Sequence, residues 1–270
     1  MGEVTCLVLL VIFMAVFTDK KDIQTLREAG KRLAGALLLA KKAVKPGVTT
    51  GELDRIAREA IEAGGDVPAF LNYKPSGASY PYPATLCVSV NNEVVHGIPG
   101  DRVLQEGDIV GLDIGLSHKG VFVDMAETVP VGKVSEVAER LMRVTEESLK
   151  KAIAAVRPGG RIGDIGAAVV DTVKAEKNFA FSIVEILGGH GVGEHVHEDP
   201  FIPNIGTKGK GPKITAGMVL ALEPIINEGT KHVVLDRDGY TWKTKDAKLS
   251  AHFEHTILVT EKGAEIITVL

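Results

Sequence analysis

Two aspartates lie inside apolar, strand-like segments of the chain, within residues 107–130, GDIVGLDIGLSHKGVFVDMAETVP. Two runs rich in β-forming residues flank LSHKG, which is typical of a turn, so we expect a β-hairpin. With the turn centred on His118 and Lys119, Asp113 faces Asp124, and directly opposed Cβ atoms lie about 4.5–5.5 Å apart. A register shift of two residues keeps both aspartates on one face. Two carboxylates placed in this way must share a proton or hold a cation.

Two glutamates repeat this pattern in the last third of the chain. Glu223 lies in MVLALEPII and Glu254 in AHFEHTILVT, and both runs are strand-like and largely apolar. A buried carboxylate without a partner is unfavourable. Either glutamate alone fits a salt-bridged strand residue. Four acids in apolar strands, without matching buried lysines or arginines, favour a metal site.

A histidine-rich segment, residues 188–200, GGHGVGEHVHEDP, is the candidate source of a nitrogen ligand. It holds His190, His195 and His197, and the glycines around His190 allow its backbone to approach a site closely. In isolation such a segment suggests metal or phosphate binding. GHGVG is not GxGxxG and no βαβ unit surrounds it, so we reject a nucleotide-binding loop.

The donor set narrows the kind of metal. Mostly oxygen ligands with one imidazole suit Mn(II), Fe(II), Co(II) or Zn(II), whereas structural zinc normally uses a closed set of cysteines and histidines. Four ionised carboxylates balance the charge of two divalent cations. This is the charge pattern of a two-metal hydrolase, in which the ions lie about 3.5–4 Å apart.

Composition excludes several other classes of protein. The chain has 270 residues, of which 45% are hydrophobic and 24% charged, so it can bury a substantial core. Its net charge of -4 gives no basic surface for nucleic acid. The two cysteines, Cys6 and Cys87, are far apart in sequence, which fits a reducing, cytoplasmic location and excludes a thiolate zinc cluster.

The N-terminus carries an unbroken apolar run, CLVLLVIFMAVF, at residues 6–17. The run is too short for a comfortable membrane span, and no basic region precedes it as in a secretory signal. Three interpretations stay open: a buried segment, an extension outside the working protein with Met14 as the true start, or a membrane anchor. We treat residues 1–18 as an extension of uncertain role and residues 19–270 as one catalytic domain.

The remaining pattern predicts a single α+β domain. Helices are expected at residues 22–45, 50–63, 134–156 and 163–176, and a loop at 64–83. Strands are expected at residues 86–91, 109–116, 121–129, 183–188, 218–226, 231–236 and 251–260.

Taken in order, the motifs resemble those of type I methionine aminopeptidases, which form subfamily A of the peptidase M24 family. They are NNEVVHGIP, GLDIG with VFVDMAET, GGHGVGEHVHEDP, ALEPIIN and KTKDAKLSAHFEHTILVT, and the match runs over residues 23–268. The resemblance implies the pita-bread fold, with pseudo-twofold antiparallel sheets covered by helices. The chain has neither an N-terminal Cys/His cluster nor a helical insert between His190 and Glu254, so it is most similar to the bacterial single-domain form.

The resemblance also implies a ligand for each of two ions. Asp113 would chelate one ion, His190 and Glu223 would bind the other, and Asp124 and Glu254 would bridge them. A bridging water or hydroxide would attack the carbonyl of the initiator methionine. Cobalt, manganese, iron and zinc all stay open as the metal.

Three side chains acquire catalytic roles from the same resemblance. Glu223 would help move a proton toward the leaving amine, His197 would stabilise the oxyanion, and His96 would contact the scissile amide or the leaving residue. Taken alone, His96 fits a satisfied structural histidine. The wall positions of the methionine pocket fall at Tyr82, Cys87, Val196 and Tyr240. Family members often carry bulkier aromatics at the last two positions, which predicts a roomier pocket, and Cys87 alone equally fits a small core residue.

The expected partners follow from that family. Substrates would be peptides and nascent chains with an N-terminal methionine, and a small second residue would be preferred. The protein would act as a monomer in the cytoplasm near the ribosome exit, although no ribosome-binding surface is evident, and neither nucleic acid nor membrane is expected as a partner. Two alternatives stay open: an Xaa-Pro aminopeptidase or dipeptidase of the same fold, and a pita-bread binding module without catalysis.

Overall fold

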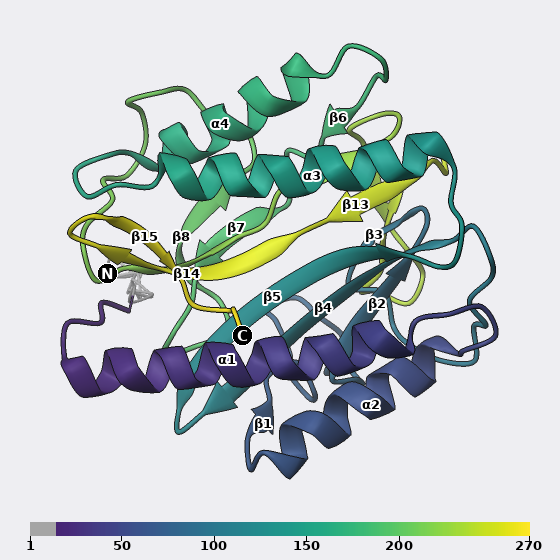
Figure 1. Ribbon diagram of the computed structural model, residues 1–270, viewed down its shortest axis with the longest axis horizontal. Coiled ribbons are helices and arrows are strands. Elements are labelled where there is room, and N and C mark those ends of the chain that lie inside the picture. The colour runs from purple at the N-terminus through teal and green to yellow at the C-terminus, as the bar shows by residue number, and fades with distance from the viewer. Residues whose placement is uncertain (1–14) are drawn as a thin grey trace, which may run out of the picture.

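The computed structural model describes residues 15–270, whose helices and strands are labelled in Figure 1. Within these residues the helices are α1 (Lys20–Ala43), α2 (Thr50–Ala63), α3 (Glu136–Ala155) and α4 (Ile162–Ala175). The strands are β1 (Val67–Pro68), β2 (Leu86–Val90), β3 (Glu93–Val95), β4 (Ile109–His118), β5 (Val121–Pro130), β6 (Ser182–Ile183), β7 (Gly188–Gly191), β8 (Glu198–Pro203), β9 (Val219–Leu222), β10 (Ile225–Asn227), β11 (Val233–Leu235), β12 (Trp242–Thr244), β13 (Ser250–His252), β14 (Glu254–Thr260) and β15 (Gly263–Ile266).

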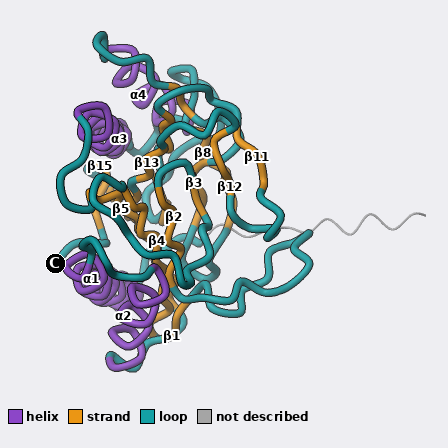
Figure 2. The backbone as a smooth tube through the Cα atoms, turned by 90° about the vertical axis from the view of Figure 1, so that its right-hand side faces the viewer, coloured by secondary structure: helices purple, strands orange, loops and turns teal. Residues whose placement is uncertain are grey.

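An antiparallel sheet forms the centre of the molecule. Its strands follow the order β1-β4-β5-β14-β9-β7-β8, with β2 beside β4 and β15 beside β14. Two smaller sheets, β13-β10-β6 and β11-β12-β3, complete the β layer. Figure 1 shows α1 and α2 along one half of the strands and α3 and α4 along the other half, and Figure 2 shows the helices on one side of the sheet. The opposite side carries loops and the small sheet β11-β12-β3.

Each helix pair covers its own hydrophobic core. Under α1 and α2 the core includes Leu26, Leu33 and Leu37, which recur on one helix face and pack against β4 and β5. A second core lies under α3 and α4 and includes Leu141 and Ile165. The two halves of the sheet join where β5 pairs with β14. The fold therefore repeats a helix pair over strands, with a seam between the repeats.

Capping residues set where the first helices begin. Asp19 accepts a hydrogen bond from the backbone N–H of Lys21 at 2.7 Å, and Thr49 accepts one from Glu52 at 3.1 Å. The helices predicted from hydrophobic spacing are confirmed, with ends that differ by at most two residues from those expected. Helical periodicity therefore located the covering layer reliably.

The central hairpin forms as expected, but the expected register is wrong. Lys119 and Gly120 form a two-residue turn with φ of 52° and 84°, which matches the twist of the strands. Asp124 therefore lies opposite Gly115, and Asp113 lies opposite Ala126. The shift is two residues, so both aspartates stay on the same face of the sheet. The turn moves because glycine adopts the left-handed conformation more readily than histidine.

Two of the predicted strands are each broken into two. The segment 218–226 forms β9 and β10 with a gap at Glu223 and Pro224, because proline has no N–H to donate to a ladder. The segment 251–260 forms β13 and β14 with a gap at Phe253. The breaks face each other, since Leu222 pairs with His255 and Ile225 with His252. Both segments leave the central sheet at this point and continue in the smaller sheet β13-β10-β6.

Short strands elsewhere also differ from the prediction. The expected strand 183–188 is instead β6 and β7, separated by an irregular segment, and the expected loop 64–83 contains β1. The strands β3, β8, β12 and β15 were not predicted. Such short strands form because neighbouring chains pair with them, and hydrophobic periodicity does not report that pairing.

Residues 15–18 enter the fold at the edge of the first core. Ala15 and Phe17 are buried there, and Val16 bridges to Met218. The backbone N–H of Ala15 donates a 2.6 Å hydrogen bond to buried Glu198. The three interpretations of the apolar run concern mainly residues 1–14, which lie outside the described residues. The boundary between an N-terminal extension and the catalytic domain at residue 18 therefore stays a prediction. Among residues 15–270, no helix combines the length and apolar character that a bilayer span requires.

Candidate metal centre

The five predicted ligands converge at the seam between the two halves of the sheet. Asp113 comes from β4, Asp124 from β5, His190 from β7 and Glu254 from the start of β14. Glu223 comes from the gap between β9 and β10. One ligand atom each from Asp124, His190 and Glu254 lies within 4.8 Å of the others. Segments far apart in sequence thus present ligands to one small volume.

Strand pairing explains why the acids share one face. Asp113 on β4 and Glu254 on β14 both lie opposite Ala126 of β5, in one row across the sheet. Asp124 lies two residues before Ala126, so its side chain points to the same face. The break at Pro224 frees the backbone of Glu223 from the ladder beside them. The metal centre therefore depends on register as much as on residue type.

Buried carboxylate oxygens in this cluster lack partners. Among the described residues, no hydrogen bond reaches Asp113 Oδ1, Asp124 Oδ1 or Glu254 Oε1, although all three atoms are shielded from solvent. Burial raises the pKa of Asp113 to about 7, and burial together with the nearby Asp113 charge raises that of Glu223 to about 8. Burial and the neighbouring acids also raise the pKa of Asp124 and of Glu254. Such a set of oxygens fits divalent cations, which supply the missing positive charge.

His190 is held in the form that can ligate a cation. Its Nδ1 lies 2.9 Å from the carbonyl oxygen of Gly191, and a carbonyl only accepts, so Nδ1 carries the proton. The lone pair therefore lies on Nε2, which is 3.7 Å from Glu223 Oε1. Burial lowers the pKa of His190 to about 4, which keeps the ring neutral at physiological pH. A Cβ on Gly189 would collide with the Ala221 carbonyl, so only glycine allows this approach.

A cavity of about 340 Å³ opens beside the ligands. All five predicted metal ligands line it, together with the predicted substrate-binding residues His96, His197, Tyr82, Cys87 and Tyr240. Val196 does not line the cavity but is buried in the same hydrophobic cluster as Tyr82 and Tyr240. His195 is exposed, and its backbone N–H donates to Glu198 at 2.7 Å. Two of the three histidines in the glycine-rich segment therefore reach the site.

His96 owes its position to a strained turn. Its φ is 60°, a value that non-glycine residues seldom adopt, and such strain concentrates at functional sites. A Cβ on the next residue, Gly97, would collide with the Val88 carbonyl. Burial lowers the pKa of His96 to about 4. The turn thus brings a neutral imidazole to the cavity, where the resemblance to the family had placed His96.

His197 lies on the open side of the cavity. Its Nδ1 is 3.1 Å from the hydroxyl oxygen of Tyr73, and its ring centroid is 4.5 Å from that of His190. Tyr73 comes from the loop after β1 and also lines the cavity. The hydroxyl contact leaves the Nε2 atom of His197 available to a ligand in the cavity.

An apolar wall closes the far side of the cavity. It contains Phe70, Tyr82, Cys87 and Tyr240, all of which are buried. The Tyr82 hydroxyl donates to the Gly97 carbonyl at 2.9 Å, so it presents its ring and not a free polar group. Burial raises the pKa of the Cys87 thiol well above its usual value, which keeps the thiol neutral. The wall therefore suits an uncharged, flexible side chain.

Comparison with known proteins places this arrangement in a family. Residues 24–261 match the model of metallopeptidase family M24. The chain belongs to metallopeptidase family M24.

Relatives within that family agree on one name. The chain is 45% identical to methionine aminopeptidase from Clostridium perfringens over 257 residues, which cover 95% of this chain and 100% of the relative. It is 44% identical to methionine aminopeptidase 1 from Bacillus subtilis, with 94% and 99% of the two chains covered. The resemblance seen in the sequence motifs is confirmed, and the chain is that of a hydrolytic enzyme.

Solved structures confirm the pita-bread fold. Methionine aminopeptidase from Rickettsia prowazekii superposes with a TM-score of 0.89 at 38% identity, covering 95% of this chain and 100% of that one. Prolidase from Pyrococcus furiosus superposes with a TM-score of 0.72 at 21% identity, covering 95% of this chain and 66% of that one. The second likeness concerns the fold alone.

Sequence reasoning missed five residues that line this site, namely Phe70, Tyr73, Pro75, Val95 and His252. Phe70 and Tyr73 lie in a segment expected to be a loop, where no periodicity marks which side chains point inward. His252 lines the cavity from the end of β13. Its signal was present, because it stands two residues before Glu254 in a strand-like run, and alternate residues share a face.

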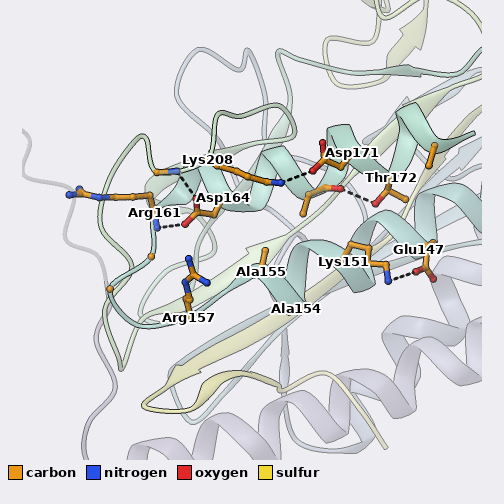
Figure 3. Close-up of a pocket in the computed structure, with 15 residues that line it drawn as sticks. Glu147, Lys151, Ala154, Ala155, Arg157, Arg161, Asp164, Asp171, Thr172 and Lys208 are labelled. Carbon is orange, nitrogen blue, oxygen red and sulfur yellow. Dashed lines mark hydrogen bonds and ion pairs between the residues drawn. The ribbon is translucent and has the colours of Figure 1, made fainter.

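A larger hollow elsewhere lacks comparable chemistry. Figure 3 shows the groove of about 1120 Å³ beside α3 and α4. Four of its charged side chains form two ion pairs along its walls, with Lys208 2.9 Å from Asp171 and Lys151 3.3 Å from Glu147. Asp164 accepts hydrogen bonds from the backbone N–H of Arg161, at the start of α4, and from that of Gly209. These side chains are already satisfied, in contrast to the carboxylates of the metal centre.

Proposed function

We propose that this protein removes methionine from the N-terminus of polypeptides, using divalent cations held by Asp113, Asp124, His190, Glu223 and Glu254. The observation that carries the proposal is that unpartnered, buried carboxylate oxygens adjoin an apolar cavity of about 340 Å³. Relatives named methionine aminopeptidase, at 45% identity over 95% of the chain, support methionine as the residue removed.

The ligand set supports two cations. Four carboxylates would carry four negative charges when ionised, which two divalent ions balance, and cobalt, manganese, iron and zinc all suit these donors. Such ions, when bound, supply an activated water and polarise a carbonyl at neutral pH. In this assignment Asp113, Asp124, His190, Glu223 and Glu254 would together hold the ions.

The side chains around the ligands suit the remaining tasks. The buried rings of Phe70, Tyr82 and Tyr240 bind the apolar methionine side chain. Glu223 accepts a proton from the attacking water and passes it toward the leaving amine.

Two neutral imidazoles complete the active site. His197, positioned by Tyr73, donates a hydrogen bond to the developing oxyanion. His96, presented by its strained turn, contacts the scissile amide or the residue that leaves. The preference for a small second residue is expected by analogy with the family.

The cellular setting is part of the proposal. Nascent chains in the cytoplasm are the expected substrates, with the protein acting as a monomer, and a ribosome contact would bring it to them. The two cysteines far apart in the sequence support a reducing compartment.

Hydrolysis of short peptides by metal-stripped enzyme, with each candidate metal added back, tests the proposal. We expect release of methionine from Met-Ala-Ser, little cleavage of Xaa-Pro peptides, and no turnover by Asp113→Ala or Glu223→Ala. His197→Ala should lose most of the activity and retain its metal content, because His197 contacts Tyr73 and is not among the proposed ligands.

The alternatives give different results in the same assay. Cleavage of Xaa-Pro peptides with little release of methionine would indicate a proline-directed peptidase, and no cleavage with any metal would indicate a binding module. Retained turnover in Glu223→Ala would contradict the assignment of the site.

A further inference from the structure

His252 faces the metal centre with an unused nitrogen. Its Nε2 lies 3.6 Å from Glu223 Oε2 and 4.0 Å from Glu254 Oε2. The side chain is 5% exposed, and among the described residues no hydrogen-bond partner reaches this atom. A buried polar nitrogen that close to two carboxylates requires an explanation, because an unmade hydrogen bond at such a site is costly.

The backbone fixes the direction of this side chain. Thr128 of β5 accepts a 2.9 Å hydrogen bond from the His252 N–H and donates a 2.8 Å hydrogen bond to the His252 carbonyl through the same hydroxyl. On its other edge, His252 pairs with Ile225 of β10. The ring is therefore aimed at Glu223 by contacts on both sides of its strand.

Glu223 lies between two imidazoles that face different oxygens. His190 Nε2 is 3.7 Å from Oε1, and His252 Nε2 is 3.6 Å from Oε2. His190 has its proton on Nδ1 and offers a lone pair to the site, as its contact with the Gly191 carbonyl requires. His252 Nε2 instead lies beside two carboxylate oxygens, Glu223 Oε2 at 3.6 Å and Glu254 Oε2 at 4.0 Å, and both oxygens accept hydrogen bonds. A nitrogen placed against acceptors in this way suits a donor better than a ligand.

We propose that His252 is a positioning residue, which donates a hydrogen bond from Nε2 to Oε2 of Glu223 and so directs Oε1 toward the cations. The separation of 3.6 Å exceeds a normal hydrogen bond by roughly 0.4 Å, which a small rotation of either side chain removes. Carboxylates that ligate metals are themselves hydrogen-bonded, and loss of such a partner typically weakens metal binding 10–100-fold, by order of magnitude. This inference rests on the proposed function only for the presence of cations.

Three variants of the full chain test it: His252→Gln keeps an N–H donor, His252→Leu removes it at similar volume, and His255→Gln is the matched control. His255 is on the other face of the strand, where its Nδ1 contacts Thr268 Oγ1 at 2.8 Å. Calorimetric titration of metal-stripped protein with Mn(II) measures affinity, and the visible spectrum of the Co(II) form reports the ligands. Circular dichroism establishes that each variant is folded.

We expect His252→Leu to bind Mn(II) on the order of 10–100-fold more weakly at unchanged stoichiometry. His252→Gln should bind within a few-fold of wild type with an unchanged Co(II) spectrum, and His255→Gln should match wild type in both. Wild-type affinity in His252→Leu would overturn the inference. A changed Co(II) spectrum in His252→Gln would also overturn it, since that result makes His252 a direct ligand. If His252→Leu does not fold, the Co(II) spectrum of His252→Gln decides between the two roles. Because neither readout uses a peptide, a failed methionine assay and a failed role for His252 remain distinguishable.

Discussion

The hairpin of β4 and β5 carries two buried clusters of acid and histidine, one at its turn and one at its middle. At the turn, His118 Nδ1 lies 2.5 Å from Asp66 Oδ1, and the Arg32 guanidinium lies 3.2 Å from Asp66 Oδ2. At the middle, Asp113 Oδ1 and Asp124 Oδ1 are equally buried and have no partner among the described residues. The two clusters share a hairpin, residue types and burial, and differ in whether the chain itself provides the positive charge.

That difference separates a structural cluster from a functional one. A buried acid with its own arginine and histidine needs nothing from solution, and it holds α1 and the loop before β1 against the hairpin. Buried acids without cations carry a desolvation penalty that raises the pKa of both Asp113 and Asp124. Only ions from solution relieve that penalty while the carboxylates stay charged. A variant in the Asp66 cluster should therefore leave metal binding unchanged. A variant of Asp113 or Asp124 should leave the stabilisation that the Asp66 cluster provides unchanged.

The largest expected effect is on turnover when the unpartnered cluster is changed. In the proposed assignment Asp124→Asn removes one of the charges that would hold the cations, so we expect methionine release to fall by at least about 10³-fold, on the order of 4 kcal/mol of transition-state stabilisation. Steady-state hydrolysis of Met-Ala-Ser at saturating metal measures it. A loss smaller than tenfold would place Asp124 outside the metal centre.

The next largest effect is on folding when the partnered cluster is changed. Asp66→Asn leaves His118 and Arg32 without their carboxylate, and breaking a buried pair typically costs about 3 kcal/mol. Urea denaturation with metal present measures the free energy of unfolding. Metal stoichiometry should remain that of wild type. If Asp66→Asn instead lost its metal at full stability, the separation of the two clusters would be wrong.

The smallest effect is the dependence of stability on pH in the metal-free protein. The Glu223 carboxyl has its pKa raised from 4.5 to about 8, so the folded state holds its proton more tightly and stability falls as pH rises through this window. The pKa of buried His190 is lowered from 6.5 to about 4, so this group makes stability rise with pH below pH 6.5. Between pH 6.5 and 8 the carboxyls act alone, and stability should fall by up to about 1.4 kcal/mol per pH unit for each proton.

Urea unfolding of stripped protein at several pH values measures this slope. Glu223→Gln should flatten it, because the amide does not titrate, and Asp66→Asn should not. A wild-type stability that stays constant or rises between pH 6.5 and 8 would contradict the burial of unpaired carboxyls.

Sequence patterns predicted the helices and singled out the candidate ligands for a clear physical reason. The spacing of Leu26, Leu33 and Leu37 reflects a local period, and acids in apolar runs are conspicuous wherever the chain takes them. The same local logic placed Asp113 and Asp124 on one face even though the register was shifted by two residues. Convergence of His190, Glu223 and Glu254 with them came from the motifs, since no local period brings distant strands together.

The features that were missed depend on pairing and on loop geometry. The break at Pro224 and the gap at Phe253 arise because two strands change sheets together, which neither segment shows alone. Tyr73 reaches His197 through a loop whose path is set by tertiary packing. His252 was accessible from the alternation before Glu254, but a neutral side chain in a strand is far less conspicuous than a buried acid.

Counting the ions bound by metal-stripped protein tests the central claim most directly. Titration with Mn(II) or Co(II), checked by elemental analysis, should give two ions per chain in wild type and in Asp66→Asn, and at most one in Asp113→Ala. A wild-type chain that binds no divalent ion, or an Asp113→Ala variant that still binds two, would contradict the claim that these unpartnered carboxylates are a dinuclear metal centre.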